Sequence, residues 1–125
     1  MEFQKGDILE GTHREFAAAY HYIVYLGQSL DNAFVGVILT KSGSWANNVP
    51  LSENFFVRED EFGTSYKVQY KNSHFMQVKL DKPQDWGPYS KVGQITAEGV
   101  KFIEEHISGM EPISYQNYEK SLGTT

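Results

Sequence analysis

The chain has 125 residues, of which 40% are hydrophobic and 22% are charged, and it contains no cysteine. These values are typical of one globular domain with a single core, and they exclude disulfide bonds and thiolate chemistry. The N-terminus lacks a signal-peptide pattern, and no run of about 18 apolar residues predicts a membrane span. We therefore expect a soluble, cytoplasmic protein without a membrane segment.

Seven short segments are rich in β-branched and aromatic residues and are bounded by turn-forming residues, as strands are. These predicted strands cover residues 6–10, 21–27, 33–40, 54–60, 65–70 and 75–80, with residues 92–95 as a short strand or a turn. The segment 75–80 alternates apolar and polar residues, which indicates a half-buried strand. The segments 41–50 and 81–90 are rich in Gly, Ser, Asn or Pro and are expected to be loops.

One helix is predicted near the C-terminus, at about residues 97–108. Thr96 is a good N-cap, and Val100, Ile103 and Ile107 recur at helical spacing. Gly109 fits the C′ position that ends a helix.

The order of these elements predicts a mostly-β fold in one domain at residues 1–109. We expect a small SH3-like barrel of five to seven strands with one C-terminal helix, followed by a tail at residues 110–125. A half-open β-sandwich is the alternative architecture.

The formal net charge is -5, but the basic residues are unevenly distributed. The segment 63–97 contains only two acids and five lysines, which are Lys67, Lys71, Lys79, Lys82 and Lys91. One interpretation is a surface that binds a polyanion, where neutralisation of phosphates dominates affinity. The other interpretation is an ordinary solvated face of a sheet.

Several segments, taken in order, resemble the PemK/MazF-type toxin family. They are KGDILEG at residues 5–11, VILTKS at 37–42, SHFMQVKLDKP at 73–83 and SKVGQITAEGVKFIEEHI at 90–107. The resemblance covers most of residues 4–107, and its last two segments are the most specific. It implies an SH3-like barrel that acts as a homodimeric endoribonuclease on single-stranded RNA, without a cofactor, and that an antitoxin protein neutralises.

The resemblance also implies where catalytic residues lie. Thr40 matches a functional residue of the family at the end of its strand. Where the family has a catalytic Arg followed by Pro, this chain has His21 and Tyr22. A histidine can transfer protons near neutral pH, so His21 is the candidate acid or base. Arg14, in the preceding loop, is the candidate that stabilises the developing phosphate charge.

Other residues near these positions are candidates for substrate binding. His13, Lys41 and Ser42 flank the candidate catalytic residues, and Trp45 could stack on a base. From the basic segment we add Lys67, Lys71, His74 and Lys79, with His74 also a possible second proton carrier. The structural alternatives are a half-buried strand residue for His21, a turn hydroxyl for Thr40, solvated loop residues for His13 and Arg14, and a loop anchor for Trp45.

Two functions are therefore open. The first is a toxin-like endoribonuclease that cleaves RNA by metal-independent transphosphorylation. The second is a non-catalytic SH3-like barrel that binds a protein, a peptide or nucleic acid. The four histidines lack the close spacing of zinc sites, so no metal site is expected.

Overall fold

Three antiparallel strands form the centre of the protein, and they are β1 (Asp7–Thr12), β2 (Tyr20–Gln28) and β3 (Phe34–Thr40). The computed structural model describes residues 3–12, 20–28, 34–40, 48–69, 74–82, 89–114 and 117. Neighbouring residues such as Ile8 and Leu9 are both fully buried, so both faces of the sheet are covered. This burial explains why these strands are almost continuously apolar in sequence rather than alternating.

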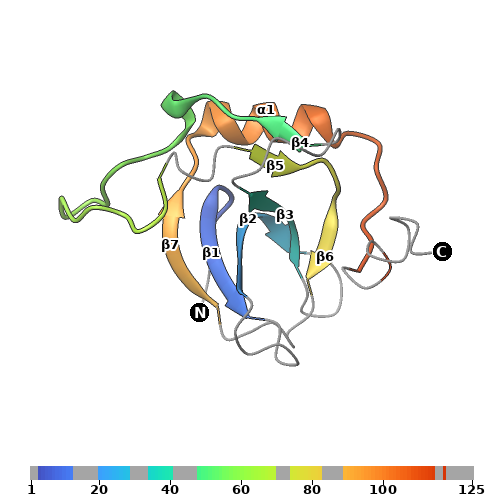
Figure 1. Ribbon diagram of the computed structural model, residues 1–125, viewed down its shortest axis with the longest axis horizontal. Coiled ribbons are helices and arrows are strands. Elements are labelled where there is room, and N and C mark those ends of the chain that lie inside the picture. Colours follow the sequence, from blue (N-terminus) through green and yellow to red (C-terminus); the bar gives the residue numbers. More distant parts are fainter. Residues whose placement is uncertain are drawn as a thin grey trace.

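Shorter strands extend the central sheet on both sides. They are β4 (Asn48–Pro50), β5 (His74–Met76), β6 (Leu80–Lys82) and β7 (Ser90–Gln94). The strand order is β4-β5-β3-β2-β1-β7, and β6 also pairs with β3. An isolated bridge between Phe56, which follows β4, and Ile95, which follows β7, brings the two ends of this order together. The sheet is therefore curved into a barrel-like shape (Figure 1).

The helix α1 (Ala97–His106) lies across one end of the curved sheet (Figure 1). Thr96 caps it, because its hydroxyl accepts a hydrogen bond from the Gly99 N–H at 3.1 Å. The predicted mostly-β, barrel-like fold with one C-terminal helix is confirmed. The helix ends slightly earlier than predicted, with Ile107 as its C-cap, and Gly109 takes its positive φ of 82° two residues later. In the described part of the chain, no helix has the length and apolar character needed to cross a bilayer.

The two faces of the sheet carry two separate groups of buried side chains. The helix-side cluster packs under α1 and includes Ile8, Val24, Leu26, Val37, Leu39, Phe75, Ile95, Val100, Ile103 and Ile107. The opposite cluster contains Leu9, Ile23, Tyr25, Phe34, Ile38, Val78 and Leu80. Consecutive residues of β1 and β2 alternate between these clusters, as the period of two requires in a strand. The assignment of a strand residue to one cluster therefore also gives the face of its neighbours.

The prediction of one continuous strand at 75–80 is wrong. A bend at residues 77–79 divides this segment into β5 and β6. On β3, three positions separate Gly36 from Leu39, yet their partners Leu80 and Phe75 are five positions apart. The bend therefore contains two residues more than the facing strand. Such an insertion increases the local twist, which allows β3 to be paired along its length in a curved sheet.

The region from 48 to 69 also differs from the predicted pattern. Residues 48–50 form β4 instead of belonging to a loop, and Glu53–Phe55 form a short 3-10 helix, η1, instead of a strand. The Ser52 hydroxyl caps η1 by accepting a hydrogen bond from the Asn54 N–H at 3.2 Å. This local cap competes with strand formation, since serine side chains readily bond nearby backbone amides.

Gly99 is a site where a substitution that favours helices should still destabilise the protein. A Cβ added to Gly99 would lie 2.5 Å from the Ile95 Cγ2 atom and 2.8 Å from the Phe55 Cβ atom. Alanine gains about 1 kcal/mol of helix propensity over glycine, but overpacking costs about 1–3 kcal/mol. We expect Gly99→Ala to lower the free energy of unfolding by about 1 kcal/mol. Urea denaturation measures this, with the exposed Lys101→Ala as a control; a more stable Gly99→Ala protein would contradict the prediction.

Candidate active site

Three positions predicted to be functional lie in one row across neighbouring strands. Position 21 on β2 is paired with Gly11 on β1, and Thr40 at the end of β3 is paired with His74 at the start of β5. The last pair between β2 and β3 joins Tyr22 to Leu39, so one further step along the same register brings positions 21 and 40 together. Directly paired residues have Cα atoms about 4.5–5.5 Å apart. The antiparallel register thus gathers residues that are 53 positions apart in sequence, from His21 to His74, at one end of the sheet.

Thr40 and His74 share one face of the sheet. Paired residues of antiparallel strands project to the same side. Ile38 and Met76, two positions away on the same strands, belong to or pack against the opposite cluster. Both Thr40 and His74 are half-buried, so they lie at the rim of that cluster rather than in it. A hydroxyl and an imidazole that are neighbours in a half-buried position can orient a phosphate and transfer a proton.

Two other candidate residues lie away from this row. The Lys67 ammonium is 3.0 Å from the Glu10 carboxylate. Glu10 on β1 is paired with Tyr22 on β2, and Tyr22 packs against the helix-side cluster. Lys67 therefore has a carboxylate partner on the other face of the sheet. Lys79 precedes Leu80, which is paired with Gly36, four residues before Thr40 on β3. Four residues of a strand span about 13 Å, so Lys79 is separated from Thr40 along the sheet.

The remaining candidates lie outside the described residues. They are His13, Arg14, Lys41, Ser42, Trp45 and Lys71. For His21 the structure describes the backbone and its pairing, but not the side chain. Within the described ranges, no group of three or more His, Asp or Glu side chains is arranged to hold a metal ion.

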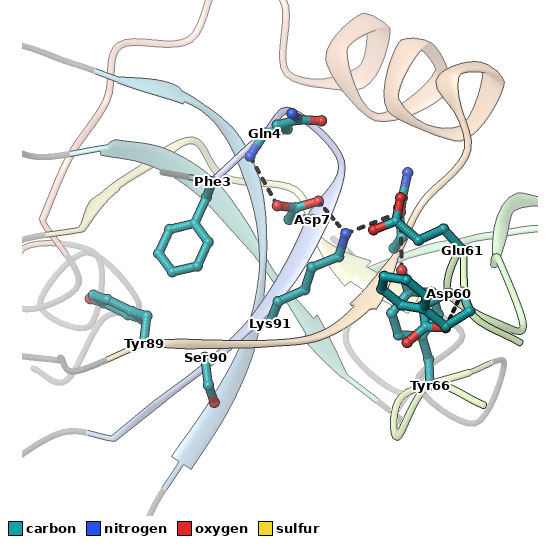
Figure 2. Close-up of a pocket in the computed structure, with 11 residues that line it drawn as sticks. Phe3, Gln4, Asp7, Asp60, Glu61, Tyr66, Tyr89, Ser90 and Lys91 are labelled. Atoms are coloured by element: carbon teal, nitrogen blue, oxygen red, sulfur yellow. Dashed lines mark hydrogen bonds and ion pairs between the residues drawn. The ribbon is translucent and has the colours of Figure 1, made fainter. Parts of the chain in front are cut away.

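The sequence did not reveal an ion pair between the buried Asp7 and the exposed Lys91, which lies beside a hollow of about 850 Å³ (Figure 2). Asp7 is only 4% exposed, and its Oδ1 atom is 3.1 Å from the Lys91 ammonium. Its Oδ2 atom accepts a hydrogen bond from the Gln4 N–H at 2.9 Å. The pair depends on the pairing of β1 with β7, which places Lys91 opposite Leu9, two residues after Asp7 on β1. A single acid directly before the Ile8-Leu9 run was the available sequence signal, but it did not identify the partner.

The protonation of Lys91 reflects this pair. Partial burial alone would lower the pKa of Lys91, but the hydrogen bond and charge of Asp7, together with Tyr66, outweigh it and raise the pKa. A lysine with a raised pKa in the folded protein stabilises the fold below its unfolded-state pKa of about 10.5. That contribution is lost as the pH rises through the higher pKa of the folded state.

We expect Lys91→Gln to lower the free energy of unfolding by about 1–3 kcal/mol at pH 7, because it leaves the buried Asp7 without its cation. The difference between wild type and variant should begin to shrink above about pH 10.5, where Lys91 loses its proton in the unfolded state, and should be lost as the pH passes the higher pKa of the folded state. Urea denaturation at pH 7, 9 and 11 measures both effects. A difference that is constant over this range would show that the charge of Lys91 does not stabilise the fold.

Comparisons of this chain with protein-family models, with curated proteins and with solved structures gave no match. The functional argument therefore depends on the residues and the geometry of this chain.

Proposed function

We propose that this protein is a cytoplasmic, toxin-like endoribonuclease of the PemK/MazF type that cleaves single-stranded RNA without a metal. The observation that carries the proposal is the pairing of Thr40 with His74, next to the Tyr22–Leu39 pair, from which position 21 is one further step along the register. Transphosphorylation needs a base for the 2′-hydroxyl, stabilisation of the phosphorane and an acid for the leaving oxygen. Two histidines and a hydroxyl in one row supply residue types suited to these tasks.

The row supports the proposed roles of His21, His74 and Thr40, and the role of Arg14 is proposed from the sequence alone. His21 accepts the proton of the 2′-hydroxyl as its oxygen attacks phosphorus, and the bond from phosphorus to the 5′-oxygen breaks. His74 donates a proton to that leaving oxygen, so the products are a 2′,3′-cyclic phosphate and a 5′-hydroxyl. Thr40 orients the phosphate, and Arg14 stabilises its added negative charge. The resemblance to the toxin family supports a role for Thr40 and a catalytic residue at position 21, although the family has an arginine there and this chain has a histidine. It also adds a homodimer and an antitoxin partner to the proposal.

The experiment incubates purified protein with a mixed-sequence single-stranded RNA and with DNA of the same sequence, both in EDTA. We expect cleavage of the RNA alone, because the 2′-hydroxyl is the nucleophile, and fragments whose 5′-hydroxyl ends a polynucleotide kinase labels directly. Thr40→Ala should be strongly impaired, while Thr40→Ser, which keeps the hydroxyl, should retain activity. No RNA cleavage by folded protein at micromolar concentration, or equal cleavage of DNA, would overturn the proposal.

A second candidate function is a non-catalytic barrel that binds another protein. The hollow beside Asp7 and Lys91 favours it, because its volume lies within the usual range of about 300–1,000 Å³ for binding pockets. Asp7 lies four residues before Gly11 on β1, a distance of about 13 Å along the strand. The other end of the hollow reaches Ser90, which is paired with Glu10 next to Gly11, so the hollow extends from Asp7 toward the row of positions 21, 40 and 74. An RNA assay without cleavage would favour this second function.

A further inference from the structure

A hairpin arm, residues 57–67, extends from the barrel beside β7 (Figure 1). Its base is bonded to the strand region, since the Val57 N–H donates to the Gln94 carbonyl and the Val68 N–H donates to the Val92 carbonyl, both at 2.9 Å. Its two sides are joined by a bridge between Glu59 and Ser65. The arm is thus attached to the barrel through backbone hydrogen bonds.

The tip of the arm holds an aromatic side chain in solvent. The Asp60 Oδ1 atom accepts hydrogen bonds from the N–H groups of Phe62 at 2.8 Å and Thr64 at 2.9 Å. Gly63 adopts a φ of 83°, which suits a tight turn at this point. Phe62 is nevertheless 85% exposed, the largest exposure recorded for a large hydrophobic residue in the described ranges. A single exposed ring is common on protein surfaces, so the importance of Phe62 depends on the residues around it.

The arm forms one wall of the hollow of about 850 Å³, and the N-terminal residues and β7 form the rest. In Figure 2, Phe3 and Tyr89 lie on one side of Lys91, and Asp60, Glu61 and Tyr66 lie on the other. Phe62 also lines the hollow. The hollow therefore combines aromatic rings with carboxylates.

The charges of this hollow favour a cationic occupant. Asp7 neutralises Lys91 at its floor, as described above. Asp60 and Glu61 also line the hollow, and neither is in an ion pair within the part of the chain that the structure describes. The Lys91 ammonium lies 5.5 Å from the centre of the Tyr66 ring, so one ring of the hollow already faces a cation. Aromatic rings and carboxylates together are suited to ammonium and guanidinium groups.

We infer that this hollow docks a basic segment of a partner protein, with a lysine or arginine side chain between Asp60, Glu61 and Tyr66. An apolar side chain next to that cation packs against Phe62. A peptide fits better than a small polyamine, because the exposed ring offers an apolar contact that a polyamine does not use. A nucleic acid is disfavoured, because two unneutralised carboxylates would face its phosphates. The inference does not require the proposed ribonuclease activity, because a peptide can dock in the hollow without any cleavage of RNA.

The test is calorimetric titration of the protein with the peptide acetyl-Gly-Lys-Leu-Lys-Gly-amide at low salt. The comparison peptide has norleucine in place of both lysines, and spermidine is titrated separately. We expect the lysine peptide to bind, and to bind more weakly at 0.5 M salt, while norleucine peptide and spermidine bind at least about fivefold more weakly. Equal binding of the norleucine peptide or of spermidine would overturn the inference, and so would no binding of the lysine peptide.

Matched variants locate the site. Asp60→Asn with Glu61→Gln removes two charges but keeps the Oδ1 acceptor that holds the turn, and it should weaken binding about three- to tenfold. Phe62→Ala should weaken binding about fivefold. The control is Glu105→Gln with Glu111→Gln, which removes two exposed charges elsewhere and should leave binding unchanged. Equal weakening by both double variants would show an unspecific charge effect and overturn the assigned site.

Discussion

His21→Ala is expected to lower the rate of RNA cleavage about 10²- to 10⁴-fold, because a positioned general acid or base contributes rate enhancement of this size. Position 21 lies on β2 and is paired with Gly11 on β1, and Ile23, two positions further along β2, is fully buried. Alanine at position 21 keeps this pairing and removes only the imidazole. The loss should therefore be in the catalytic step, with RNA binding changed much less.

Single-turnover cleavage measured with His21→Ala separates the two effects, and RNA binding is measured in parallel by fluorescence anisotropy. Gln28→Ala is the matched control, since Gln28 is exposed at the other end of the same strand. Free imidazole in the buffer should restore part of the activity of His21→Ala and should not affect wild type. Unchanged cleavage by His21→Ala would remove His21 from the mechanism, and a loss that imidazole does not restore would indicate a structural role.

The parts of the fold that sequence predicted well are those in which local pattern and tertiary packing agree. The central strands were predicted because their apolar runs are buried on both faces, as Ile8 and Leu9 illustrate. The helix was predicted correctly because its N-cap is determined locally. Thr96 is a good N-cap residue by type, and in the structure its hydroxyl caps the helix. The break between β5 and β6 could not be predicted, because it results from the register of β3 with two segments at once. An alternating pattern is compatible with either a straight or a broken strand.

The candidate site was predictable in its residues but not in its geometry. Thr40 and His74 were each selected from sequence, yet their pairing depends on β5 lying next to β3. Lys67 was selected from a basic segment, but its charge is directed to Glu10. The pair of Asp7 and Lys91 joins residues 84 positions apart, through the pairing of the first and last strands. Local sequence does not contain the information on which strands become neighbours.

Phe75→Ala is expected to lower the free energy of unfolding by about 3–5 kcal/mol, the usual cost of deleting a buried aromatic ring. Phe75 is fully buried on β5, where it is paired with both Leu39 and Val49. Its ring packs edge-on against Phe102 at 6.3 Å and against His106 at 5.9 Å, so it joins the sheet to α1. A domain of this size is stable by about 5–15 kcal/mol, and the variant should therefore lose a large part of its stability.

Urea denaturation of Phe75→Ala measures this loss, and Phe62→Ala is the control, since Phe62 is 85% exposed and its removal should change stability by less than about 0.5 kcal/mol. Phe75 also directly follows His74 in β5, so the cavity should loosen the row that contains Thr40 and His74. Phe75→Leu, which fills more of the space, should therefore recover stability and RNA cleavage together. A Phe75→Ala protein as stable as Phe62→Ala would show that the helix does not depend on this contact with the sheet. Recovery of stability by Phe75→Leu without recovery of cleavage would instead separate the packing of β5 from the proposed catalytic row.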